Sequence, residues 1–105
     1  MEEKYTIAEL CKEMKKFVAE RDWDQYHTPK NLAMSITIEA AELMEHFQWL
    51  NNERSIELLK NPLERSKVVD ELADIFLYCL SFVNILEFIF SAIIIRIHIR
   101  MVFAR

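Results

Sequence analysis

The sequence predicts an all-α protein, and three observations lead to that prediction. The 105-residue chain contains no Gly and only two Pro, whereas a β-rich domain needs Gly for turns with positive φ. Its apolar residues recur at the spacing of amphipathic helices. Hydrophobic residues make up 52% and charged residues 29%, a balance that excludes a disordered or low-complexity chain. We therefore expect a single all-α domain over residues 1–105, since this length is typical of one domain.

The first helix is expected to begin at a capping box, in which Thr6 precedes Glu9 by three residues. The apolar residues that follow it lie three or four positions apart, as on one face of a helix. They are Ile7, Leu10, Cys11, Met14, Phe17 and Val18. We expect this helix to end near Arg21, and residues 22–27 to form a polar and aromatic loop.

Start and stop signals divide the remainder of the chain into further helices. Thr28-Pro29 combines an N-cap residue with a proline at the first helical position. The second helix is expected to run from there to about Leu50, where two Asn residues follow. A short helix is expected over 54–60, a long one over about 63–86, and a last helical element over the rest of the chain.

Apolar stripes on all of these helices give so short a chain more hydrophobic surface than it can bury alone. We expect a four-helix bundle-like protomer that assembles into a homodimer or homotetramer.

Charge is distributed unevenly along the chain. Residues 1–87 carry a net charge of −7, whereas residues 88–105 contain three Arg and no acid. An acidic body does not attract the backbone of a nucleic-acid polymer, which requires clustered Lys and Arg. If the ligand is an anion, a divalent cation is the obvious source of compensating charge.

Two pairs of acidic residues lie beside the apolar stripes of the two long helices. Glu39 and Glu42 form one pair and Glu71 and Asp74 the other, each separated by three residues, or about one turn. Antiparallel packing through the stripes would bring four carboxylates together, and these need a cation to ionise at one site. Oxygen ligands favour Mg²⁺ or Mn²⁺. The alternative is ordinary surface charge, because acids at this spacing are common on helices.

Other chemistries have less support. A di-iron bundle requires Glu-x-x-His, and neither long helix contains that motif. Cys11 and Cys79 lie among apolar residues and are expected to be free, buried thiols rather than a disulfide. Without Gly, no phosphate-binding loop of the Walker or dinucleotide type is possible.

The apolar run over 75–95 is interrupted by polar residues, Asn84 and Glu87 among them. Because polar groups are costly in a membrane, a buried helix with an apolar tail is favoured over a membrane span. The N-terminal residues lack the pattern of a signal peptide, so a cytoplasmic location is expected.

Three segments resemble a known family. They are ERDWDQYHTPKNL at 20–32, EAAELMEHFQW at 39–49 and DELADIFLY at 70–78. In order and spacing they resemble the MazG-like all-α nucleoside triphosphate pyrophosphohydrolases, especially the dCTP pyrophosphatase-like branch, over about residues 5–87.

The resemblance implies a Mg²⁺-dependent hydrolase that converts a (d)NTP, with dCTP or a modified dNTP as candidates, to the monophosphate and pyrophosphate in a house-cleaning role. Mn²⁺ is a candidate substitute for Mg²⁺. The family's metal ligands, which are also its catalytic residues, match Glu39, Glu42, Glu71 and Asp74.

Four further residues match positions in or near the family's base pocket. Trp23 and Trp49 match aromatic residues that line it, and His27 and Tyr78 lie at positions near it. Taken alone, a Trp at a helix boundary is more often a core residue than a stacking platform. His27 could simply cap or pack its loop, and Tyr78 could be a core residue with its hydroxyl satisfied.

The tail departs from the family pattern. Members usually continue into a polar helix whose Lys and Asn contact phosphate, and residues 88–100 contain neither. Arg96 and Arg100, about one turn apart, could take over that phosphate-binding role. The alternatives are a catalytically impaired helical assembly domain on the same scaffold and, from another class, a membrane-attached helical protein.

Overall fold

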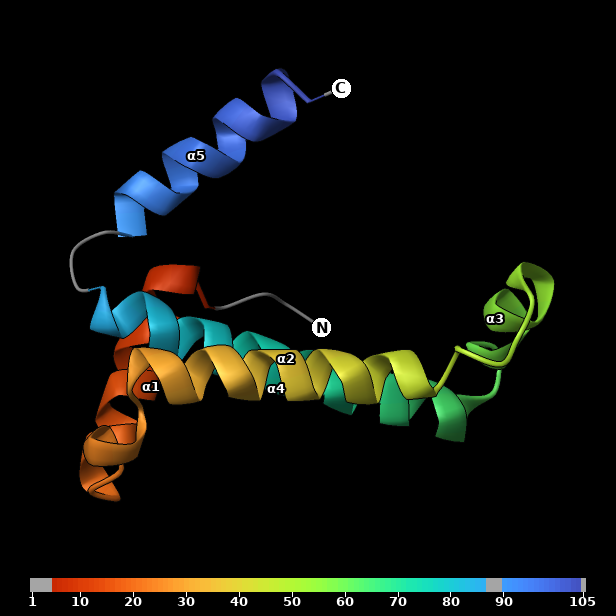
Figure 1. Cartoon of the computed structure of the whole chain (residues 1–105), viewed down its shortest axis with the longest axis horizontal. Helices are drawn as coiled ribbons and strands as arrows, with labels where there is room; N and C mark the ends of the chain where they lie inside the picture. The colour runs from red at the N-terminus through yellow and green to blue at the C-terminus, as the bar shows by residue number, and fades with distance from the viewer. Residues whose placement is uncertain (1–4, 87–89, 105) are drawn as a thin grey trace.

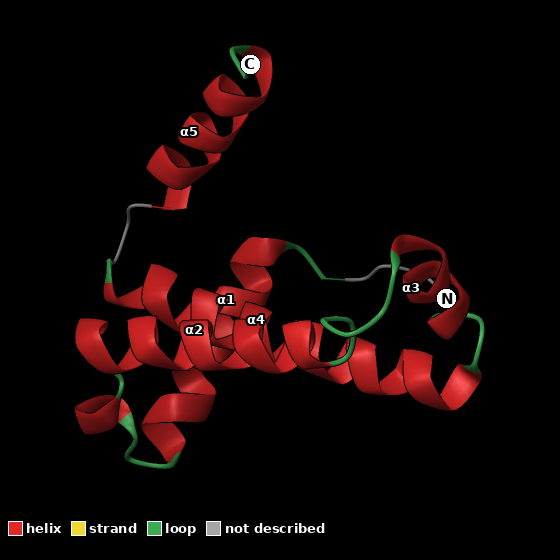
Figure 2. Cartoon of the chain, turned by 45° about the vertical axis from the view of Figure 1, so that its right-hand side comes forward, coloured by secondary structure: helices red, strands yellow, loops and turns green. Residues whose placement is uncertain are grey.

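The structure of the chain is a computed structural model that describes residues 5–86 and 90–104. Within these residues it is all-helical, as the sequence predicts, and contains no strand (Figure 2). The elements are α1 (Ile7–Glu20), a 3₁₀ turn η1 (Asp24–Tyr26), α2 (Pro29–Glu45), α3 (Asn52–Leu58), α4 (Pro62–Ile85) and α5 (Phe90–Val102).

Side-chain caps fix where the helices begin. The Thr6 hydroxyl accepts a hydrogen bond from the Glu9 backbone N–H at 3.1 Å, and the Glu9 carboxylate accepts one from the Thr6 N–H at 2.9 Å, which confirms the capping box. Thr28 caps α2, and the Asn61 side chain accepts from two backbone N–H groups at the start of α4. These caps supply acceptors for N–H groups that the helices leave unpaired.

α2 ends at Glu45, five residues before the predicted end at Leu50. Residues 46–50 instead form tight turns, in which the Leu50 N–H donates to the Phe47 carbonyl at 2.9 Å. Beyond these turns, Asn51 adopts an extended backbone and its side chain accepts from the Arg54 N–H at 2.8 Å. That cap starts α3.

α2 and α4 lie side by side and antiparallel, and α1 packs against α4 (Figure 1). The Asn84 side chain donates a 2.8 Å hydrogen bond to the Cys11 carbonyl and so joins α4 to α1. α3 and α5 project away from this group, in views that differ by 45° (Figures 1 and 2). The described part of the protomer is therefore a packed group of three helices with two outlying ones, more open than the predicted four-helix bundle.

The core of the single chain is small. Among the residues whose burial the structure describes, the buried hydrophobic ones are Cys11, Val18 and Leu32, of which Leu32 is 1% exposed. By contrast, large apolar side chains remain exposed along α2 and α4, including Met34, Ile38, Met44, Val69, Leu72 and Phe76. The apolar stripes thus extend over more surface than one copy of the chain covers.

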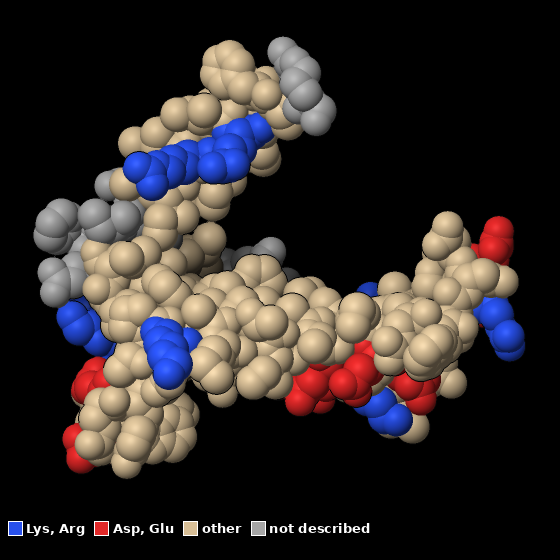
Figure 3. Space-filling model, viewed as in Figure 1, with Lys and Arg blue, Asp and Glu red and all other residues tan. Residues whose placement is uncertain are grey.

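α5 keeps the uneven charge that the sequence indicates. Figure 3 shows basic side chains running along α5, and in this view acidic ones only on the other helices. The basic residues are Arg96 and Arg100, set among Ile, Met and Val.

Cys11 and Cys79 are free thiols, buried and half-buried respectively, as expected. Within residues 5–86 and 90–104, no helix is both long and apolar enough to cross a membrane. Glu87, one of the predicted interruptions of the apolar run, lies outside the described residues.

Candidate metal centre and active site

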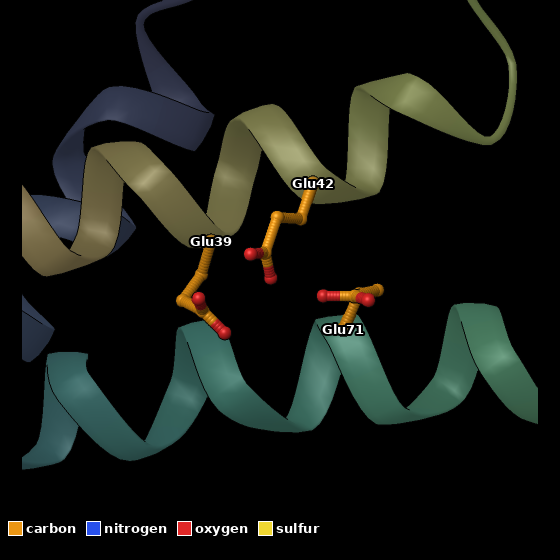
Figure 4. A group of neighbouring side chains, drawn as sticks. All are labelled: Glu39, Glu42 and Glu71. Atoms are coloured by element: carbon orange, nitrogen blue, oxygen red, sulfur yellow. The ribbon is translucent and has the colours of Figure 1, made fainter.

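Three glutamates converge between the two long helices (Figure 4). Glu39 and Glu42 lie one turn apart on α2, and Glu71 faces them from α4. One carboxylate oxygen from each of the three lies within 4.8 Å of the other two. Both predicted acidic pairs contribute to this cluster, because the antiparallel register of α2 and α4 sets Glu42 against Glu71 and Glu39 against Asp74.

The cluster strongly perturbs its own ionisation. Burial, followed by the hydrogen bonding and charge of Glu42 and Asp74, raises the pKa of Glu39 to about 7. The pKa of Glu71 is also raised, by burial and then by Glu42, with His46 acting in the opposite direction. Burial and the neighbouring carboxylates thus make ionisation of Glu39 and Glu71 less favourable, and Glu39 is partly protonated near neutral pH unless a cation replaces the proton.

Glu71 has one oxygen that the surrounding protein leaves unsatisfied. Its Oε1 lies 3.7 Å from His46 Nε2, but its buried Oε2 has no hydrogen-bond partner. An acceptor buried without a donor is costly. Together with the neighbouring oxygens of Glu39 and Glu42, it forms a donor set of the kind taken by hard divalent cations.

An aromatic cluster surrounds Trp23, in the loop between α1 and α2. The Trp23 ring stacks on the His27 ring, with centroids 6.4 Å apart and planes inclined by 19°. Phe17 meets the Trp23 ring edge-on at 5.8 Å and 70°, and the Arg21 guanidinium lies 3.4 Å from the centre of the Phe17 ring. Trp23 nevertheless remains 42% exposed, so the ring is supported by neighbours and still accessible.

The remaining predicted site residues are dispersed in the single chain. Trp49 follows α2 and is 86% exposed, at the opposite end of that helix from Trp23. Tyr78 is half-buried on α4, four residues after Asp74. Arg96 and Arg100 lie on α5, which projects away from the carboxylates (Figure 1). One copy therefore brings together the acidic residues but neither the two tryptophans nor the arginines.

Two residues that the sequence analysis did not assign to the site contact predicted ones. His46 approaches Glu71, and its position four residues after Glu42 was the available signal. Ser81 is 4% exposed, and its hydroxyl lies 3.2 Å from His27 Nδ1. It follows Asp74 by seven residues, which places it on the same face of α4, but its partner lies 54 residues away in sequence.

Comparison with known proteins agrees with this arrangement. The model of the MazG-like family matches residues 34–101. The chain is 38% identical over 73 residues to bovine (Bos taurus) dCTP pyrophosphatase 1, and 36% identical over the same length to the human (Homo sapiens) protein. These matches cover 70% of this chain and 43% of each relative, so the chain spans less than half the length of the curated relatives it matches.

A solved structure gives a similar result over the whole fold. The crystal structure of a pyrophosphatase from Archaeoglobus fulgidus aligns with a TM-score of 0.79 at 31% identity. The alignment covers 100% of this chain and 98% of that one. Through its family-model match, its curated relatives and its fold, the chain belongs to the MazG-like family.

Proposed function

We propose that the chain is a Mg²⁺-dependent nucleotide pyrophosphohydrolase, which converts a (d)NTP such as dCTP or a modified dNTP to the monophosphate and pyrophosphate. The observation that carries the proposal is the cluster of Glu39, Glu42 and Glu71 with its unsatisfied buried oxygen. The names of the similar proteins, dCTP pyrophosphatase 1 and a pyrophosphatase, support the reaction class.

Glu39, Glu42, Glu71 and Asp74 would hold the metal. The donor set fits Mg²⁺ or Mn²⁺ because it consists of carboxylate oxygens, one of them buried and without a hydrogen bond. When bound, the ion supplies charge neutralisation for the triphosphate and polarisation of the α-phosphate.

The carboxylates also supply a proton acceptor. Any of the four could serve as the general base for water attacking the α-phosphate, provided that it is ionised and not fully engaged by the metal. His46, beside Glu71, would help to orient that carboxylate.

The pyrophosphate-release assay tests this function. Wild-type chain with Mg²⁺ should release pyrophosphate from at least one canonical or modified dNTP. Glu42→Ala should abolish release while leaving the helical circular dichroism intact. The matched control is Glu45→Ala, on the same helix but exposed and outside the cluster, which should stay active. A wild-type chain that releases no pyrophosphate would instead favour the catalytically impaired assembly domain.

We further propose that the chain works as a homodimer or homotetramer. Support comes from the small core of the single copy and from the apolar surface left exposed on α2 and α4. If a two-fold axis relates the copies, their two α2 helices can pair antiparallel. The C-terminal end of α2 in one copy, with Trp49, would then lie near the N-terminal end of α2 in the other copy, with Trp23. Light scattering at micromolar concentration should therefore give a mass well above 12.6 kDa, and a monomer would contradict the proposal.

A further inference from the structure

We infer that Ser81 is a positioning residue for the base end of the nucleotide site, acting through His27 on Trp23. The inference rests on the proposed function, since it assigns a role within that site. It concerns a residue that does not itself touch the nucleotide, because Ser81 is 4% exposed and lies beneath His27.

Each contact in the series from Ser81 to Trp23 is given by the geometry. The Ser81 hydroxyl and His27 Nδ1 are 3.2 Å apart, which is hydrogen-bond distance. The His27 ring then stacks on the Trp23 ring at 6.4 Å. Because His27 belongs to a loop and Ser81 lies four residues before the end of α4, the hydrogen bond attaches a loop side chain to a helix.

Phe17 supports the Trp23 ring from a second direction. Its edge-to-face contact at 5.8 Å comes from α1, and Arg21 covers the Phe17 ring at 3.4 Å. The Arg21 guanidinium also lies 5.9 Å from the centre of the Trp23 ring. These supports leave an indole that is fixed yet 42% exposed. A fixed aromatic ring stacks on a base at a lower entropic cost than a mobile one.

Ser81 also fixes where this ring lies relative to the carboxylates. It follows Asp74 by seven residues on the same face of α4, about 10 Å along the helix axis. A ribose and its phosphates can bridge such a separation. α4 thus carries two of the proposed metal ligands, Glu71 and Asp74, and the anchor for the base platform two turns after Asp74.

Kinetics on Ser81→Ala provide the main test. We expect KM for dCTP to rise about three- to tenfold, as part of the stacking contribution is lost, while kcat stays within about twofold because the carboxylates are untouched. The matched control is Asn84→Ala, which removes a 2.8 Å hydrogen bond from the same helix to Cys11 and leaves the Ser81–His27 pair in place. It should lower the melting temperature and leave KM unchanged.

A binding experiment separates this inference from the proposed reaction. In a Trp49→Phe background Trp23 is the only tryptophan, since the chain has two. The probe is the non-hydrolysable α,β-imido analogue of dCTP with Mg²⁺, which should quench Trp23 fluorescence. Adding Ser81→Ala should raise its Kd about three- to tenfold. Wild type could release no pyrophosphate while Ser81→Ala still raises the Kd of the analogue. In that case the proposed hydrolase reaction is wrong, whereas the positioning role of Ser81 stands.

Several results would overturn the inference. Unchanged KM and Kd in Ser81→Ala would do so, and so would an equal rise in KM in Asn84→Ala, which would indicate a general loss of packing. No binding of the analogue to wild type would also overturn it. Should Ser81→Ala fail to fold, the near-isosteric Ser81→Cys decides: its thiol is only a weak hydrogen-bond partner for His27, so KM should still rise, and an unchanged value refutes the positioning role.

Discussion

Protons and the metal ion should compete for the carboxylate cluster, so lowering the pH should weaken metal binding. Burial and the neighbours Glu42 and Asp74 raise the pKa of Glu39 to about 7. A bound cation favours the ionised form. Metal binding below pH 7 must therefore displace a proton that is absent at pH 8.

The size of the effect follows from that pKa. With a pKa of about 7, Glu39 is about nine-tenths ionised at pH 8 and about one-tenth ionised at pH 6. The apparent Kd for Mn²⁺ or Mg²⁺ should then rise about tenfold between pH 8 and pH 6, or ~1.4 kcal/mol. Glu71, whose pKa is also raised, adds to the loss in the same direction.

Titration of Mn²⁺ followed by electron paramagnetic resonance of the free ion measures this Kd at each pH. Calorimetry in two buffers of different ionisation enthalpy counts the protons released. Glu39→Gln should bind metal weakly at every pH and lose the Glu39 part of the pH dependence, while the exposed Glu45→Gln should behave as wild type. A Kd that does not change between pH 6 and pH 8 would refute this reasoning.

The same pKa predicts the pH dependence of stability without metal. The folded-state pKa of Glu39 lies above its ordinary value of 4.5, so the folded chain binds more protons than the unfolded one between these values. This contribution to stability is fully present below about pH 4.5 and is lost as the pH rises through about 7. As the pH rises from about 4.5 through about 7, the melting temperature of metal-free wild type should fall relative to that of Glu39→Gln.

Three further predictions concern the core, the base pocket and the tail. Leu32→Ala, at the most buried position of α2, should cost about 2–4 kcal/mol of unfolding free energy, measured by urea denaturation at fixed protein concentration. Trp49→Ala should raise KM with a smaller effect on kcat if the exposed indole stacks on the base, and an unchanged KM would remove Trp49 from the site. Replacing Arg96 and Arg100 together by Ala should lower kcat sharply if they contact phosphate, and an active enzyme with unchanged kcat would show that they do not.

Helix starts and the acidic pairs were predictable from sequence because both depend on local geometry. A cap such as Thr6 binds a backbone group three residues away, and a three-residue spacing places Glu39 and Glu42 on adjacent turns of one face. The pairing of that face with Glu71 followed from one further step, that apolar stripes pack together. Only that step depends on tertiary structure, and the facing glutamates confirm it.

Features that depend on distant residues could not be predicted in this way. α2 ends at Glu45 and gives way to tight turns over residues 46–50, although the helical pattern of the sequence continues to Leu50. The contact of His27 with Ser81 joins residues 54 apart, and a buried Ser within an apolar run has no distinctive sequence signal. Its assignment requires knowing which loop lies over that turn of α4.

α5 shows why the helical pattern alone leaves the assembly open. Apart from Arg96 and Arg100 on neighbouring turns, most of its side chains are apolar on every face, and those from Ile94 onward are exposed. A helix that is apolar nearly all round is stable when it is buried on several sides, and the described part of this chain leaves α5 standing apart (Figure 1). In the proposed homodimer or homotetramer, a second copy would cover it. The arginines would then reach a phosphate site only in the assembly, so their effect on kcat should disappear under dilution to monomer, while binding of the metal to the carboxylates of each copy should persist.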